Sequence, residues 1–166
     1  MVIVADVAMS TSILLRPTTA DDLPILFAHQ YDPEASRMAA FPSREREAFF
    51  THWHTKVLGN PNTISRAILF EGNVTGHVGA WNDIETGDRM LGYWLGREYW
   101  GRGIASAAVR AFLEVETTRP LTARVAKHNV ASIRVLEKSG FLRTGEEQFP
   151  LFDGSTGEGF IYQLTA

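Results

Sequence analysis

The sequence has no cysteine among its 166 residues, which excludes disulfides, thiolate nucleophiles and zinc sites built on cysteine. It also has no excess of positive charge, because 16 Lys and Arg stand against 19 Asp and Glu and the formal net charge is -3. Without a basic field, a nucleic-acid backbone or an anionic membrane is a poor partner. We therefore expect no nucleic-acid and no membrane partner, and a cytoplasmic location fits the absence of cysteine.

Long hydrophobic runs and flexible linkers are missing as well. The apolar opening MVIVADVAM is short, has no basic start and is interrupted by Asp6, so it predicts neither a signal peptide nor a membrane span. No linker rich in proline, glycine and serine divides the chain, and no repeat is present. Hydrophobic residues make up 45% and charged residues 21%, which is typical of a globular protein. We expect one domain over residues 1–166, with residues 1–12 as an extension of unknown role.

What the chain does contain is a regular alternation of strand and helix patterns. Runs rich in β-branched and aromatic residues, bounded by turn residues, predict strands, and apolar residues at helical spacing predict helices. The strands are expected over residues 13–17, 63–70, 74–81, 89–95 and 121–126, and in two runs between 141 and 164 around the loop 153–159. The first helix is expected within residues 18–30, starting near Asp21 because Pro24 is tolerated only in a first turn. The other helices are expected over residues 44–58, 104–118 and 129–140.

The order of these elements predicts the fold class. Pro42 and Ser43 offer a cap for the second helix, Arg119-Pro120 a stop for the third and Gly140 a terminator for the fourth. Strand, glycine-rich turn, helix and strand between residues 89 and 126 form a parallel crossover. A meander, one βαβ unit and a closing hairpin together predict a mixed α/β fold with helices on both faces of the sheet.

The segment EYWGRGIASAAVRAFL, residues 98–113, places Gly101 and Gly103 around Arg102 just before a helix. The free N–H groups of a helix N-terminus carry partial positive charge, and glycines let an anion approach them. No Lys-Ser or Lys-Thr follows, as a Walker loop requires, and no third glycine stands near Ser106, as a dinucleotide fingerprint requires. The pattern is typical of a phosphate loop of another kind, or of a tight strand-to-helix turn.

A second motif, NVASIRVLEKSGF, follows at residues 129–141. Together with WGRGIA it resembles the GNAT acetyltransferase family, and the longer run LGYWLGREYWGRGIASAAVRAFL with LLRPTTADDLP is similar to the branch of ribosomal-protein N-terminal acetyltransferases. The resemblance extends from Ile13 to the C-terminus. It implies a GNAT-type fold with a mostly antiparallel sheet. It also implies direct acetyl transfer from acetyl-CoA to a primary amine within a ternary complex.

The same resemblance implies where acetyl-CoA binds. The pyrophosphate would lie on the glycine loop and the first helical turn, the pantetheine arm would pair with the preceding strand, and Asn129 would hold an amide of that arm. The predicted cofactor-binding residues are Tyr93, Trp94, Leu95, Trp100, Gly101, Arg102, Gly103, Ile104, Ala105, Ser106, Asn129 and Ser132.

Two positions depart from the family pattern. Trp100 stands where the family has Gln or Arg, so one polar phosphate contact is lost. Leu136 stands where many members carry a Tyr that protonates the leaving thiolate. Ser132 is the nearest matching hydroxyl, and we predict it as the catalytic acid, although an isolated serine there is more often a surface or cap residue.

Acetyl transfer also requires a neutral amine, and hence a base or a water relay. The connection WNDIETGDRM offers three carboxylates. Asp83 and Asp88 fit turn residues, whereas Glu85 matches a glutamate at the corresponding connection of the ribosomal branch. We predict Glu85 as the catalytic base.

The histidines and the acceptor leave alternatives open. His77 lies in a strand, where a structural role is commoner than a catalytic one, and His52 and His54 lack a third ligand, so we expect no metal site. The acceptor is a peptide N-terminus or a small amine such as a polyamine or an antibiotic. A non-catalytic CoA-binding module also remains consistent with Leu136. The oligomeric state stays open, a homodimer being one alternative.

Overall fold

The computed structural model describes residues 12–151 and 153–166. The expected N-terminal extension, residues 1–12, therefore lies outside the described residues except for Ser12. None of the helices in the described ranges is long and apolar enough to cross a membrane.

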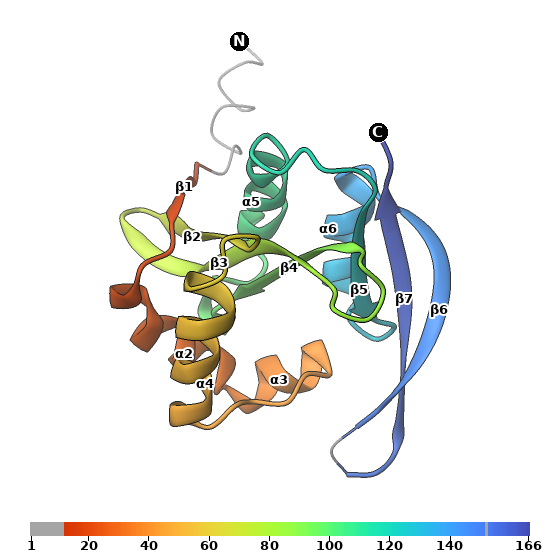
Figure 1. Ribbon diagram of the computed structural model, residues 1–166, viewed down its shortest axis with the longest axis horizontal. Helices are drawn as coiled ribbons and strands as arrows, with labels where there is room; N and C mark the ends of the chain where they lie inside the picture. The colour runs from red at the N-terminus through yellow and green to blue at the C-terminus, as the bar shows by residue number, and fades with distance from the viewer. Residues whose placement is uncertain (1–11, 152) are drawn as a thin grey trace.

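A seven-stranded sheet runs through the described part of the chain (Figure 1). Across the sheet the order is β1-β2-β3-β4-β5-β7-β6, and all neighbouring pairs are antiparallel except β4 and β5. This confirms the predicted sheet and its parallel crossover, although the last strand begins at Thr156, inside the expected loop 153–159. The strands are β1 (Leu14–Pro17), β2 (Ile64–Phe70), β3 (Asn73–Asn82), β4 (Arg89–Leu95), β5 (Leu121–Ala126), β6 (Leu142–Pro150) and β7 (Thr156–Leu164).

Helices cover both faces of this sheet, as predicted. In Figure 1, α2, α3 and α4 gather on one side of β3 and β4, and α5 and α6 lie on the other. The helical elements are η1 (Ala20–Asp22), α2 (Leu23–Gln30), α3 (Pro33–Ala39), α4 (Arg46–His52), the π-helical turn η2 (Trp53–Leu58), η3 (Arg97–Tyr99), α5 (Ile104–Phe112) and α6 (Val130–Lys138).

The larger hydrophobic core lies between the sheet and α5 and α6. Helix α5 buries Ile104, Ala108, Val109 and Phe112, each at most 1% exposed, which matches the predicted helical spacing. Burying side chains of the size of Ile104, Val109 and Phe112 stabilises the fold by roughly 1.5–3 kcal/mol each. Because only η3 and the glycine loop separate β4 from α5, this packing fixes the N-terminus of α5 close to the end of β4.

The smaller core lies on the opposite face. Phe49 and Trp53 are buried against Leu23 and Leu26 of α2, and Phe50 and Val57, which are partly buried, pack against the same cluster. Gly59 ends this segment, as expected.

The start of α4 differs from the prediction. Its N-cap is Glu45, not Ser43, because the Ser43 hydroxyl donates to the Gln30 carbonyl at 3.0 Å and shares a 2.6 Å hydrogen bond with the Ser36 hydroxyl. Helix α3 was not predicted at all. Its signal is nonetheless in the sequence, since the Asp32 side chain accepts from the backbone N–H of Glu34 and a proline follows Asp32.

The end of α5 also differs. The helix stops at Phe112, seven residues before the predicted stop at Arg119-Pro120. The backbone N–H groups of Val115 and Glu116 both donate to the Phe112 carbonyl, which turns the chain there. The reason is tertiary, because the Glu116 side chain is held by β4.

Candidate active site

Strands β4 and β5 run side by side for a short distance and then separate. Their parallel ladder ends at Met90 and Thr122, after which β4 continues on β3 and β5 continues on β7. Backbone groups of β4 that face β5 beyond this point have no strand partner, and an extended ligand can add to such an edge. We call the opening between residues 91–95 and 123–126 the β4/β5 split.

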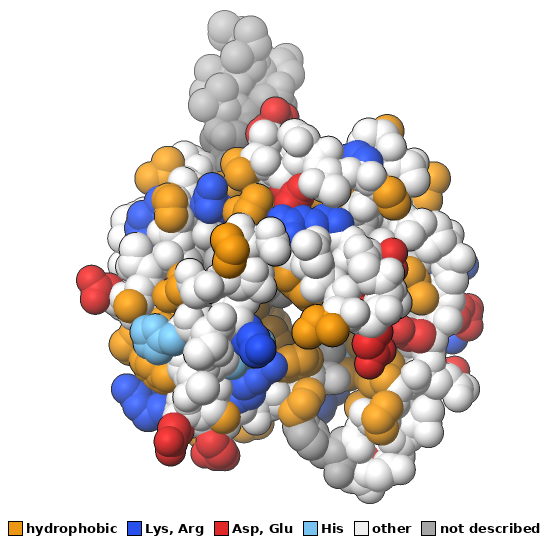
Figure 2. All heavy atoms as spheres, viewed as in Figure 1, with side chains coloured by type: hydrophobic (Ala, Val, Ile, Leu, Met, Phe, Trp, Pro, Cys, Tyr) orange, Lys and Arg blue, Asp and Glu red, His pale blue; other side chains and the backbone are white. Residues whose placement is uncertain are grey.

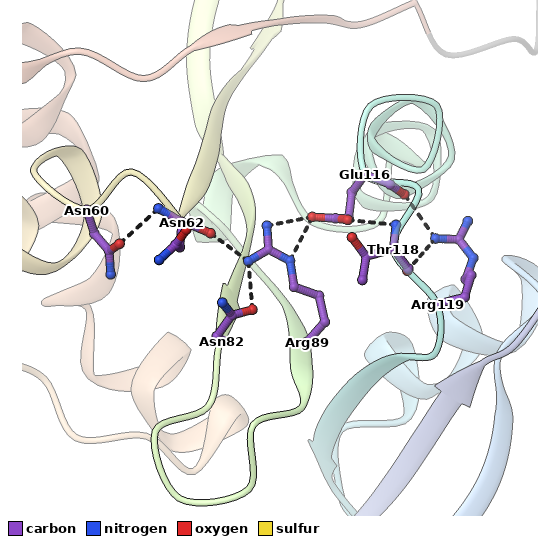
Figure 3. Close-up of polar contacts among 7 residues, drawn as sticks. All are labelled: Asn60, Asn62, Asn82, Arg89, Glu116, Thr118 and Arg119. Carbon is purple, nitrogen blue, oxygen red and sulfur yellow. Dashed lines mark hydrogen bonds and ion pairs between the residues drawn. The ribbon is translucent and has the colours of Figure 1, made fainter.

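The closed end of the split is pinned by a polar network around Arg89 (Figure 3). Its guanidinium donates to the Asn62 carbonyl at 2.6 Å and to Oδ1 of Asn82 at 3.1 Å. On its other side it pairs with the Glu116 carboxylate, which also accepts from the backbone N–H of Thr118. The network joins the segment before β2, the strands β3 and β4, and the segment after α5. Sequence reasoning missed it, because Arg89 is 27 residues from both Asn62 and Glu116.

The glycine loop follows the open end of β4. Gly101 and Gly103 have φ angles of 75° and 77°, the left-handed conformation that favours glycine. The first hydrogen bond of the helical ladder runs from Ala107 N–H to the Gly103 carbonyl at 3.1 Å. The N–H groups of residues 104–106 precede that ladder and are free of helical partners. The backbone thus meets the requirements both of a tight turn and of an anion cradle.

The side chain of Trp100 anchors this loop. Its Nε1 donates to the Leu95 carbonyl at 3.2 Å, so the residue in the position of the family's polar side chain ties the loop to the end of β4. Next to it, the Arg102 guanidinium lies 5.9 Å from the Tyr99 ring centroid. The predicted loop residues are therefore brought together at the open end of the split.

Tyr93 and Ser132 meet on the α6 side of the sheet. The Tyr93 hydroxyl lies 2.5 Å from Oγ of Ser132, in the first turn of α6. Asn129 is the N-cap of this helix, and its Oδ1 accepts from the Ser132 N–H at 3.2 Å. Capping occupies that oxygen, so the Asn129 amide nitrogen is the group left to meet a ligand. Both residues that the sequence singled out on α6 thus lie beside the strand that borders the split.

Burial raises the pKa of Tyr93 to about 12, although its hydrogen bond to Ser132 opposes the shift. The phenol is therefore protonated at neutral pH. Sequence reasoning missed the contact of the Tyr93 hydroxyl with Ser132, because the partner on α6 lies 39 residues away. By contrast, Leu136 is 1% exposed within the larger core, so its side chain offers no polar group to the site.

Trp94 points to the opposite face, as the alternation of a strand requires. Its Nε1 donates to the His29 carbonyl at 3.2 Å, and its ring contacts that of Phe41. Trp81 lies across Gly92 so closely that a Cβ there would come within 2.7 Å of the indole. Figure 2 shows this face hollowed near its centre, with hydrophobic side chains around the hollow. We call the side chains of Phe41, Trp81 and Trp94 the aromatic wall.

Glu85 lies in the exposed turn between β3 and β4. Its N–H donates to Oδ1 of Asp83 at 2.8 Å, and Asp83 also accepts from Thr86, which confirms Asp83 as a turn residue. The turn lies at the closed end of the split, whereas Tyr93 lies further along β4. Among the described contacts, the Glu85 side chain has no hydrogen bond or ion pair, so its role as a base stays a prediction.

Two carboxylates lie close to Arg124 on β5. Arg124 on β5 lies 3.7 Å from Asp83 and 3.4 Å from Glu147 on β6. The arginine therefore offsets part of the negative charge of these carboxylates.

His77 has a structural setting. Its ring packs edge-on against Trp53 at 4.8 Å, and burial lowers its pKa to about 4, with the charge of His29 adding to the effect. The imidazole is thus neutral at pH 7. Within the ranges the structure describes, no group of three or more His, Asp or Glu is arranged to hold a metal ion.

Comparison with known proteins bears directly on this geometry. Residues 12–142 match the family described as acetyltransferase (GNAT) domain. Two curated relatives are similar: "Putative ribosomal N-acetyltransferase YdaF" of Bacillus subtilis, 29% identical over 70% of this chain and 66% of that protein, and "Uncharacterized N-acetyltransferase p20" of Bacillus licheniformis, 30% identical over 79% of each. The chain thus spans about two thirds of the length of YdaF.

Solved structures share the fold at lower identity. RimL, a ribosomal L7/L12 alpha-N-protein acetyltransferase in complex with coenzyme A, superposes with a TM-score of 0.78 at 18% identity, over 95% of this chain and 96% of RimL. Spermidine N-acetyltransferase from Vibrio cholerae, in complex with CoA and spermine, superposes with a TM-score of 0.79 at 14% identity, over 92% and 95%. Since the family match spans most of the sequence and includes both the glycine loop and the Ser132 helix, the chain belongs to the GNAT family of N-acetyltransferases, for which acetyl-CoA is the co-substrate.

Proposed function

We propose that this protein transfers the acetyl group of acetyl-CoA directly to the primary amine of a peptide or protein N-terminus. The observation that carries the proposal is the β4/β5 split, with the glycine loop at its open end and the Ser132 hydroxyl beside the bordering strand. Such an opening suits a long, thin donor with a charged end. The name of the YdaF relative and the RimL likeness support the acceptor class.

The residues around the split fit acetyl-CoA. The free N–H groups at the start of α5, held by Gly101 and Gly103, suit the pyrophosphate. The unpaired edge of β4 at residues 93–95 suits the amide groups of the pantetheine arm, as an added strand would. The Asn129 amide nitrogen suits a carbonyl of that arm. Acetyl-CoA supplies the activated acyl group, and the protein supplies positioning and proton transfer.

In this proposal Ser132 donates a proton to the leaving sulfur, and the acceptor amine loses its proton to Glu85, directly or through water. A neutral amine and a thioester react without a covalent enzyme intermediate, and the chain has no cysteine to form one. Ser132 takes the place of the family tyrosine, since Leu136 lies in the core.

Arg124 favours a peptide over a polyamine as the acceptor. A polycation is best bound by several carboxylates that lack a cationic partner. Asp83 and Glu147 both have Arg124 within 4 Å, and Glu85, which has no ion pair among the described residues, is assigned in this proposal to the acceptor amine itself. The aromatic wall, with Trp81 41% and Phe41 43% exposed, instead offers apolar contact to the residues that follow a peptide N-terminus.

The direct test is the release of free CoA from acetyl-CoA across a panel of N-terminal peptides, polyamines and aminoglycosides. Because the protein has no cysteine, a thiol reagent reports released CoA without a protein background. We expect release above the hydrolysis background with peptides. Preferential release with a small amine would assign the alternative acceptor class. Calorimetric binding of acetyl-CoA without release by any acceptor would indicate a binding module that has lost chemistry.

A further inference from the structure

The hydroxyls of Tyr93 and Ser132 connect the strand that borders the split with the helix beside it. Oη and Oγ are 2.5 Å apart, whereas the Ser132 carbonyl oxygen is 3.3 Å from the phenol. That carbonyl belongs to the backbone of α6, where the helical ladder already uses it. The shorter contact, to Oγ, is therefore the main hydrogen bond of the phenol.

Each hydroxyl is held by a different rigid element. Tyr93 is paired in the ladder with Val78 of β3, and Ser132 is held at the start of α6 by the Asn129 cap. Neither side chain is fully buried, and Tyr93 belongs to the strand that borders the split. If the phenol donates to Oγ, the hydrogen of Ser132 is left to point at another acceptor.

We propose that Tyr93 is a positioning residue that directs the Ser132 hydroxyl toward the leaving sulfur and replaces its proton during acetyl transfer. This rests on the function proposed above. In the step, the N–C bond to the acceptor forms and the C–S bond breaks. Ser132 gives its proton to sulfur while Tyr93 gives its proton to Oγ. The phenolate is then reprotonated by solvent, and the proton of the acceptor nitrogen goes to the base.

Acid strengths explain why a second hydroxyl is needed. A serine hydroxyl is, like water, a far weaker acid than an alkyl thiol with a pKa of about 8.5, so leaving the negative charge on Ser132 would be strongly unfavourable. Burial raises the pKa of Tyr93 to about 12, which makes it a weaker acid than an ordinary phenol. It is still a much stronger acid than serine, and it stays protonated and able to donate at neutral pH.

The first experiment needs no substrate. Because the chain has no cysteine, Ser132→Cys introduces a single thiol next to the Tyr93 hydroxyl. A phenol that donates to this position stabilises the thiolate, since hydrogen bonds to charged groups are strong. We expect the acid dissociation constant of the thiol, measured from the pH dependence of alkylation by iodoacetamide, to fall about tenfold when Tyr93→Phe is added. An unchanged constant would show that the phenol does not donate to position 132.

The second experiment uses Tyr93→Phe alone. We expect kcat to fall by about tenfold or more while the calorimetric Kd for acetyl-CoA stays within twofold. The dependence of kcat on the fraction of D₂O should indicate two transferred protons in the wild type and one in the variant. Tyr162→Phe is the matched control, because the Tyr162 hydroxyl donates to Glu137 and has no contact with Ser132. That variant should keep the wild-type kcat.

The outcomes separate the two proposals. If no acceptor in the panel makes the wild-type protein release CoA, the proposed function is contradicted. The thiol measurement in Ser132→Cys still tests the hydrogen bond in that case. An active wild type with normal kcat and isotope effect in Tyr93→Phe overturns the role of Tyr93 and leaves the acetyltransferase proposal intact. Circular dichroism of each variant confirms that it is folded.

Discussion

Arg89 and Glu116 form an ion pair at the closed end of the β4/β5 split, with Nη2 2.7 Å from Oε2 and side chains that are 11% and 3% exposed. Although burial by itself raises the Glu116 pKa, hydrogen bonds from Thr118 and Arg89 outweigh that effect and lower it. Breaking a pair of this kind leaves a buried charge without its partner. The pair therefore stabilises the point at which β4 and β5 are still joined.

Arg89→Met should lower the free energy of unfolding by about 3 kcal/mol, because Glu116 would keep its burial and lose its cation. Urea denaturation at pH 7 measures this change. The matched control is Arg37→Met, which breaks the exposed pair between Arg37 and Glu34 and should change stability little. Equal changes in the free energy of unfolding would show that the buried pair stabilises the fold no more than the exposed pair does.

His77 should make the fold sensitive to mild acid. Burial, with the charge of His29 adding to it, lowers its pKa from 6.5 to about 4. Above pH 6.5 the His77 imidazole is neutral in the folded protein and in the unfolded chain. As the pH falls toward 4, the imidazole binds a proton in the unfolded chain but not in the folded protein. Stability is thus lost with falling pH, by about 3 kcal/mol over this window. The urea midpoint, measured from pH 7 to 4, should fall more steeply with falling pH for the wild type than for His77→Leu. The same pH dependence in both proteins would contradict the burial effect.

Gly103→Val should weaken acetyl-CoA binding by more than tenfold, which corresponds to about 1.4 kcal/mol. At φ 77° a branched side chain strains the turn and stands in front of the free N–H groups of α5. Calorimetry on the folded variant measures the affinity. Gly72→Val imposes similar strain at φ 80° in the β2–β3 turn, and it should leave the affinity for acetyl-CoA unchanged. Normal affinity in Gly103→Val would remove the phosphate role of the loop.

Ser132→Ala should lower kcat by roughly 10²-fold and leave the Kd for acetyl-CoA nearly unchanged, as expected for the loss of a general acid. Steady-state kinetics with the best acceptor from the panel, together with calorimetry, separates the two quantities. Ser139→Ala is a suitable control, since the Ser139 hydroxyl donates to the Val135 carbonyl at the other end of α6. Wild-type turnover in Ser132→Ala would show that this serine has no catalytic role.

Glu85→Gln should lower kcat/KM for the amine by roughly 10²-fold at pH 7 without changing donor affinity, if the carboxylate accepts the amine's proton. The defect should shrink at pH 9, because more of the acceptor is neutral without help. Rates for wild type and variant at the two pH values give the comparison. A loss of the same size at both would mean that Glu85 binds the acceptor and does not deprotonate it.

Much of the local structure could be predicted because its signals lie close together in the sequence. Strand β4 begins and ends where the run RMLGYWL predicts, and the apolar spacing that ends at Phe112 identifies the buried face of α5. The signal of the glycine loop is also local. Two glycines just before a helix allow the left-handed turn, and the N–H groups of the first helical turn lack helical partners whatever the position of the helix in the fold. Helix α3 was missed although its Asp-Pro start is local, because the segment is short and has little apolar spacing.

The amino-acid sequence by itself determined the strands, most of the helices, the loop and the family to which the chain belongs. Only the tertiary structure decided that β4 and β5 part after Met90, that Arg89 holds Glu116, and that the Tyr93 hydroxyl meets Ser132. Propensity and periodicity act over a few residues, whereas these contacts join segments 27 and 39 residues apart. Such contacts depend on sheet order and register, which are set by the packing of the whole core.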